Sequence, residues 1–169
     1  MRLRILTVLT ASLLGTCVFA QAQQPKPMSI EVFPFELEDK SAGAGIIPPD
    51  EYDRRYLSEA ADVARDMLSQ SGRFTVLNVP ATGDIQATAP HGLRNCDGCE
   101  GQLAKEHGAS LALIGVVTRV NRTEHTMFIR ILDAESGKPV AVGFTDLRMG
   151  ANYAWPRSVK WVMTNKILK

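Results

Sequence analysis

Cys96 and Cys99 are the residues of this sequence whose type and spacing most directly suggest chemistry. Two residues separate them, and this Cys-x-x-Cys spacing is found in structural disulfides, thiol oxidoreductases and zinc sites. A third cysteine, Cys17, lies in an amino-terminal segment with the features of an export signal. In an oxidising compartment an isolated pair spaced this closely is expected to form a disulfide. The favoured interpretation is therefore a structural disulfide between Cys96 and Cys99.

Three other kinds of chemistry use cysteine pairs of this spacing. A thiol oxidoreductase would use Cys96 as a thiolate, with a pKa lowered by the start of the following helix. No thioredoxin-like strand pattern precedes the pair, and no aromatic residue or proline lies within it. Zinc needs four ligands, and only His91 and His107 lie nearby, at irregular spacing. Haem attachment needs a histidine where this chain has Glu100. Redox chemistry is the alternative; no metal or cofactor is predicted.

The remaining polar residues do not form a catalytic pattern. Turn and helix-cap chemistry accounts for Asp39, Asp50 and Asp133. Ser69 and Ser71 lack the histidine and acid that activate a serine nucleophile. No glycine-rich phosphate loop is present. We therefore predict no catalytic and no cofactor-binding residues, and a protein that is not an enzyme.

Two tryptophans lie in a helical pattern over residues 153–168. Their spacing places them at different angles around the helix, with Trp155 on the apolar stripe and Trp161 outside it. An exposed tryptophan is a common anchor in protein interfaces. Trp161 is therefore the better candidate for a contact with a protein partner, although partial burial against the sheet is the favoured interpretation.

The amino terminus has the three parts of a secretory signal. Arg2 and Arg4 precede an apolar stretch over residues 5–19 that is too short to favour a membrane span. A small-x-small cleavage pattern ends at Ala22. We predict a signal peptide over residues 1–22 and a periplasmic product without a transmembrane segment.

The division of the remaining chain follows from its composition. Residues 23–27 are polar and punctuated by proline, which predicts a disordered leader before a single α/β domain over residues 28–169. Lipid anchoring at Cys17 is the alternative to cleavage, although Thr16 departs from the lipobox pattern. The net charge of +1 and the pI of about 7.7 give no basic patch for nucleic acid.

Alternating and helical patterns predict the order β-α-β-α-β-β-β-α, an α/β sandwich with helices packed against a mixed sheet. The apolar run from Leu111 to Val117 should be the central strand, buried on both faces. Pro34 cannot donate a ladder hydrogen bond, so the first strand should be irregular there. Strands are predicted over 28–37, 73–79, 111–117, 126–132 and 138–149, and helices over 51–71, 100–107 and 153–168.

Several short segments resemble known families. Residues 30–37, 71–76, 108–115 and 133–137 follow a layout similar to the amino-terminal domain of TolB and to the curli-secretion lipoprotein family. Residues 95–100 resemble a group of secreted bacterial proteins of unknown function, some encoded near periplasmic quinoprotein alcohol-oxidation systems. The resemblance implies an assembly or partner-binding module without catalytic residues. The chain lacks the lipobox and membrane-inserting hairpin of the curli group, so pore formation does not follow.

These observations predict a non-enzymatic periplasmic accessory or partner-binding protein, supporting a periplasmic oxidation or envelope-assembly system. The rival hypothesis is a thiol-redox or small-ligand-binding protein. In that case the long loop over residues 38–50 and the turn at Cys96 and Cys99 would form two walls of one pocket.

Overall fold

A mixed sheet forms the centre of the computed structural model, which describes residues 26–78, 83–148 and 154–169. The predicted signal peptide (residues 1–22) and most of the predicted leader lie outside these residues. The strand order is β3-β1-β4-β5-β6, and β2 also pairs with β4. The strands are β1 (Met28–Val32), β2 (Glu36–Asp39), β3 (Phe74–Leu77), β4 (Leu111–Arg119), β5 (Glu124–Asp133) and β6 (Pro139–Arg148).

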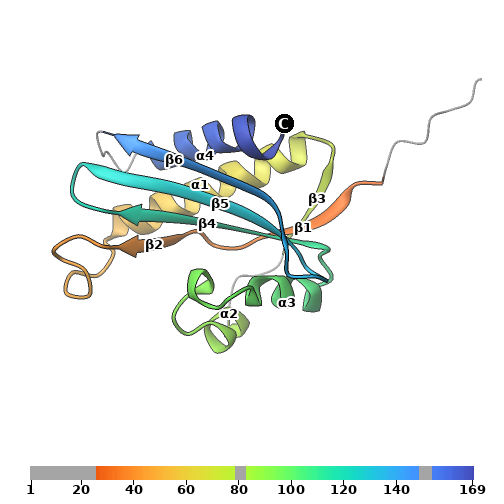
Figure 1. The fold of residues 1–169 in the computed structure, drawn as a ribbon, viewed down its shortest axis with the longest axis horizontal. Coiled ribbons are helices and arrows are strands. Elements are labelled where there is room, and N and C mark those ends of the chain that lie inside the picture. Colours follow the sequence, from red (N-terminus) through yellow and green to blue (C-terminus); the bar gives the residue numbers. More distant parts are fainter. Residues whose placement is uncertain (1–25, 79–82, 149–153) are drawn as a thin grey trace, which may run out of the picture.

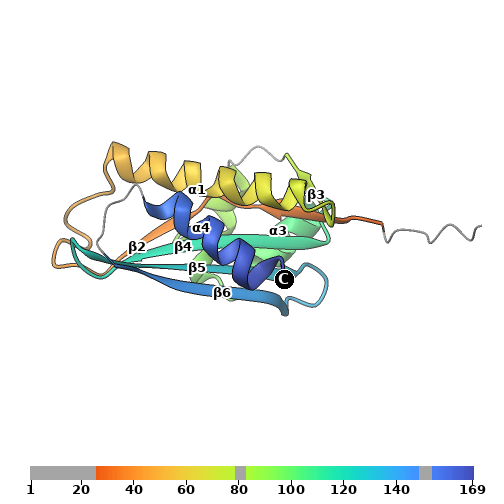
Figure 2. The same cartoon turned by 90° about the horizontal axis from the view of Figure 1, so that it is seen from above.

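Helices cover both faces of this sheet (Figures 1 and 2). α1 and α4 pack together on one face, over a large apolar core, and α2 and α3 lie on the other face over a smaller core. The predicted α/β architecture with a mixed sheet is therefore confirmed. The helices are α1 (Glu51–Gln70), α2 (Gly83–Thr88), η1 (Leu93–Asn95), α3 (Cys99–Glu106), α4 (Trp155–Val162) and the π-helix η3 (Met163–Ile167).

The first predicted strand is interrupted around Pro34, as the missing N–H of proline led us to expect. The two parts, β1 and β2, both pair with β4 in parallel. The interruption also places the side chains of Phe33 and Phe35 on opposite faces of the sheet. Phe33 packs in the smaller core and Phe35 in the larger one. An unbroken strand would place both phenylalanines on one side of the sheet, but regular alternation stops where the ladder stops.

β4 is the central strand, as predicted, and its residues from Leu111 to Val117 are buried. It pairs in parallel with β1 and β2 on one side and antiparallel with β5 on the other. A Cβ atom at Gly115 would overlap the ring of Phe35. Glycine is therefore required where the interrupted strand brings that ring over β4.

The two long helical segments follow their sequence patterns. Asp50 caps α1 in a capping box with Asp53, whose side chain accepts a hydrogen bond from the Asp50 backbone N–H at 3.2 Å. In α4 and η3 the predicted apolar stripe is buried against β5 and β6. Its members are Trp155, Val159, Val162, Met163 and Ile167.

Candidate functional site

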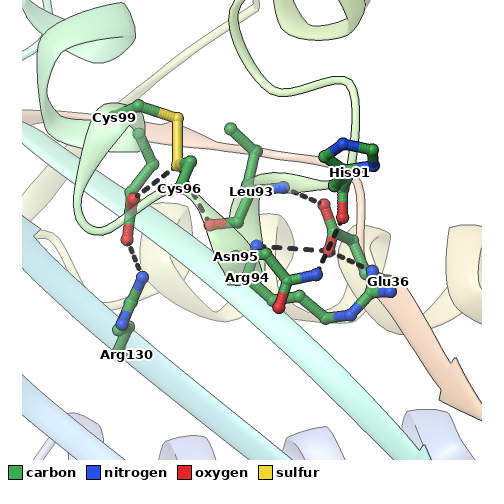
Figure 3. Close-up of a disulfide and its surroundings, with 9 residues drawn as sticks. Glu36, His91, Leu93, Arg94, Asn95, Cys96, Cys99 and Arg130 are labelled. Carbon is green, nitrogen blue, oxygen red and sulfur yellow. Dashed lines mark hydrogen bonds and ion pairs between the residues drawn. A yellow bond between two sulfur atoms is a disulfide. The ribbon is translucent and has the colours of Figure 1, made fainter.

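The Cys96–Cys99 disulfide closes the turn between η1 and α3 (Figure 3), as the spacing predicted. The two Cα atoms are 5.5 Å apart. Asp97 and Gly98 both have left-handed backbones, with φ of 51° and 99°. Cys99 is the first residue of α3, and both cysteines are half-buried. The sulfurs thus lie at the start of a helix, at the edge of the smaller core.

A carboxylate lies directly beside this disulfide. Glu100 is fully buried (0% exposed) and forms an ion pair with Arg130, which reaches it from β5 (Figure 3). The second carboxylate oxygen of Glu100, Oε2, lies 3.6 Å from Sγ of Cys96. Sequence reasoning used Glu100 only to exclude haem attachment. It missed the pair with Arg130 because only the packing of α3 on the sheet brings the two side chains together.

A second carboxylate holds the segment that precedes the disulfide. Oε1 of Glu36, on β2, accepts a hydrogen bond from the backbone N–H of Leu93 at 2.6 Å. Oε2 of Glu36 accepts one from Nη1 of Arg94 at 2.8 Å. A Cβ atom at Gly92 would lie 2.6 Å from Glu36 Oε2, so glycine lets this approach occur. η1 is therefore tied to the sheet just before the chain reaches Cys96.

Three side chains at the turn are of kinds that can bind a metal ion. Donor atoms of Cys96, Cys99 and Glu100 lie within 4.8 Å of one another. The two sulfurs are bonded to each other, however, and Glu100 faces Arg130. His107 instead lies 2.9 Å from the Glu31 carboxylate, measured from Nδ1. The three donors at the turn are therefore already engaged.

A second feature lies at the end of the molecule where β2 meets α1 and β4 meets β5. A hollow of about 840 Å³ opens there, and we call this end the loop pole. Arg119 is one of the residues that line the hollow. It is ion-paired with Asp53, lies 3.3 Å from Asp39, and donates from Nε to Nε2 of His125 at 3.4 Å. Four separate segments of the chain thus share one network, which local sequence patterns did not indicate.

His125 is buried in this network, although it directly follows the polar residues 121–124. Burial lowers the pKa of His125, and the charge of Arg119 lowers it further. Its ring packs on Trp155, with 5.9 Å between the centroids. Within the described residues, neither Nδ1 of His125 nor Nε1 of Trp155 has a hydrogen-bond partner. Burial and the charge of Arg119 thus both favour the neutral form of the His125 ring.

The rim of the loop pole is apolar and exposed. Ile46, Ile47 and Tyr52 are 81%, 66% and 60% exposed. Ile47 and Tyr52 also line the hollow. Two large exposed apolar side chains at a hollow, with exposed Ile46 next to them in the chain, are typical of a surface that binds another molecule.

The loop and the cysteine turn do not form two walls of one pocket, so that prediction was wrong. The hollow at the loop pole is lined by the loop and its neighbours, and neither cysteine is among its lining residues. The turn at Cys96 and Cys99 belongs to the smaller core on the α3 side of the sheet. In Figures 1 and 2 the loop after β2 projects from one end of the sheet, away from α3.

The two tryptophans lie as their helical angles predicted. Trp155 is 1% exposed and belongs to the larger core. Trp161 is 46% exposed, and Nζ of Lys166 lies 5.8 Å from the centroid of its ring. The role of Trp161 in a partner contact stays a prediction.

Residues 28–167 match the profile of a protein family described as "Protein of unknown function (DUF2380)". This chain belongs to that family, DUF3280. The predicted membership in a group of unknown function is confirmed, and the likeness to TolB and the curli group stays a prediction. No curated protein matches the DUF3280 chain in sequence. Within its described residues, no helix has the length and apolar character needed to cross a membrane.

Several solved structures resemble this DUF3280 chain in fold. A PelC dodecamer from Paraburkholderia phytofirmans has a TM-score of 0.48 and 14% identity, covering 86% of this chain and 91% of that one. For lipoprotein GNA1162 from Neisseria meningitidis the TM-score is 0.47 and the identity is 21%, and the match covers 82% of this chain and 98% of that one. For the LpoB C-terminal domain from Salmonella enterica the TM-score is 0.46 and the identity is 13%, and the match covers 73% of this chain and 84% of that one. At these TM-scores none of the likenesses indicates a function.

Proposed function

We propose that this chain is a non-enzymatic accessory protein of the bacterial envelope that binds another protein through its loop pole. The observation that carries the proposal is the exposure of Ile46, Ile47 and Tyr52 around the hollow. Water contact with side chains of this size is unfavourable by about 25 cal/mol for each Å² of apolar surface. A partner that covers the rim would remove this cost.

The shape and charge of the loop pole favour a protein over a small molecule. Ile46 is the most exposed of the three rim residues and does not line the hollow, so a ligand confined to the hollow would leave it in water. The guanidinium of Arg119 is already engaged by Asp39, Asp53 and His125. The hollow therefore contains an arginine that is already engaged by the protein itself, while the rim offers apolar contact area. That combination suits the apolar side chains of a protein partner.

Charged side chains of both signs surround the apolar rim. The start of α1 carries the acidic residues Asp50 and Glu51, both exposed, next to the apolar rim. Arg54, Arg55 and Arg122 are also exposed there, so the loop pole carries charges of both signs, as protein surfaces that bind one another commonly do.

The sequence supports the setting of this function. A charged start, a short apolar stretch and a small-x-small site predict export to the periplasm. The resemblance of residues 95–100 to secreted proteins encoded near quinoprotein systems suggests a partner in periplasmic oxidation, and the wider layout suggests one in envelope assembly. Either system would use a binding module of this kind.

The test is affinity capture from native envelope extract, with the full chain expressed and exported with its own signal. Ile46→Ser with Ile47→Ser should abolish capture of the proteins that the unchanged chain retains. Val140→Ser with Val142→Ser is the matched control, because those valines are exposed aliphatic residues on β6. The control should capture the same proteins. Equal capture by both double variants would show that the loop pole is not the binding surface.

A further inference from the structure

We propose that two copies of this chain associate through β6, which pairs antiparallel with β6 of the second copy about a two-fold axis at Val142. The sheets of the two copies would then form one continuous sheet. None of the described residues of β6 lines the hollow at the loop pole. This inference therefore goes beyond the proposed function and does not depend on it.

β6 is an outer strand of the sheet with an open edge (Figure 2). It has 10 residues, and among the strands of the described ranges only β5 pairs with it. Such an edge presents unpaired N–H and C=O groups to another chain, and proteins usually block it with proline, charge or a bulge. In β6 the proline is the first residue and the register shift lies beside Val140. From Ala141 to Thr145, neither proline nor a charged residue blocks the edge.

Large apolar side chains of the same strand are exposed to water. Val140, Val142 and Phe144 are 57%, 50% and 50% exposed. Val142 and Phe144 lie opposite Arg130 and Phe128 of β5, on the face of the sheet where Arg130 meets α3. Contact of this strip with water is unfavourable, and a strand placed beside β6 would cover part of it.

The residues of this strand are complementary to the same strand run in reverse. Identical strands related by a two-fold axis pair antiparallel, and residues at equal distances from the axis lie opposite each other. With the axis at Val142, this valine meets its own copy, Val140 meets Phe144, and exposed Lys138 meets exposed Asp146. Moving the axis by one residue would place Asp146 opposite Val140, or Lys138 opposite Phe144. Because opposite charges and apolar pairs stabilise paired strands, the pattern favours a second copy as the occupant.

The other edge of the sheet is a poorer partner for β6. That edge is β3, which has 4 residues. Pairing of β6 with β3 would also leave a free edge on each copy and continue into a filament. Pairing of β6 with itself closes after two copies and covers the longer edge of both.

Sedimentation equilibrium of the exported full chain tests the association. The unchanged chain should form a dimer that dissociates on dilution. Val142→Lys places two like charges together at the axis, so it should raise the dissociation constant of the dimer at least about tenfold. Val120→Lys is the matched control, because Val120 is an exposed valine that lies outside β6, and it should leave the dimer unchanged.

Both substitutions are at exposed positions, and circular dichroism checks that the fold is kept. A chain that stays monomeric at every concentration would overturn the proposal, even if β6 binds a strand of some other protein. A dimer that is equally tight in Val142→Lys would also overturn it, since the copies would then meet elsewhere.

A charge reversal tests the register. Lys138→Glu should weaken the dimer about fivefold, because it faces Asp146 and the pair occurs twice in the dimer. Adding Asp146→Lys restores opposite charges at both places and should restore the dissociation constant. A double variant no tighter than Lys138→Glu would overturn the axis at Val142 and the proposal with it.

The capture experiment at the loop pole has a separate readout. Its control, Val140→Ser with Val142→Ser, should dissociate more readily into monomers and still capture the same proteins. Either proposal can therefore fail without the other.

Discussion

At the scale of single residues, the ion pair between Arg130 and Glu100 gives the largest expected effect on stability. Arg130→Met would leave the Glu100 carboxylate buried without its counter-charge. Breaking a buried pair in this way typically costs about 3–5 kcal/mol. We expect the free energy of unfolding, measured with urea, to fall by about that amount. Adding Glu100→Leu to this variant should recover much of the loss, and equal stabilities of the unchanged and Arg130→Met chains would contradict the assignment.

The buried neutral His125 should make stability depend on pH. Its pKa is lowered in the folded state, first by burial and then by Arg119, so the unfolded chain binds the proton more readily. This contribution to stability is complete above the ordinary histidine pKa of about 6.5 and decreases as the pH falls below it.

Thermal unfolding between about pH 7.5 and pH 5 measures this dependence. The unchanged chain should lose stability toward the acid end, and His125→Gln should lose less over the same range. His91→Gln is the control, because that histidine is exposed. A pH dependence that is the same in all three chains would show that His125 does not titrate between the folded and unfolded states.

At the scale of elements, the disulfide joins η1 to α3 across a turn of two left-handed residues. Cys96→Ser with Cys99→Ser should lower the free energy of unfolding by about 2 kcal/mol, since the closed loop is short. The fold should persist, because Glu36 still holds the start of the turn and Glu100 still pairs with Arg130. Urea unfolding and circular dichroism measure the two effects. Loss of the folded spectrum would show that the disulfide is needed for folding itself.

At the scale of the whole molecule, the predicted signal peptide determines where the mature chain would begin. We predict cleavage after Ala22, since the charged start, the short apolar stretch and the small-x-small site coincide. The intact mass of chain recovered from the periplasm should correspond to a start at Gln23. A lipid-modified product that starts at Cys17 would instead place the protein on a membrane surface.

Sequence patterns predicted most of the architecture, because those patterns are set by local geometry. The apolar run of β4, the cap at Asp50 and the stripe of α4 each follow from the period of a strand or helix and from the needs of free backbone groups. The Cys96–Cys99 disulfide follows equally from short spacing. The interruption at Pro34 was also expected, although its effect on Phe33 and Phe35 was not.

The candidate sites were decided by tertiary structure. Arg130 reaches Glu100 only because the register of β5 places it opposite Ile114, on the face that α3 covers. Likewise, Arg119 meets Asp39 and Asp53 only where β2, β4 and α1 end together. A charged side chain has the same local pattern whether it is solvated or buried with a distant partner. The sequence by itself therefore determined the elements and the disulfide, whereas the packing of distant segments determined which charges lie beside them.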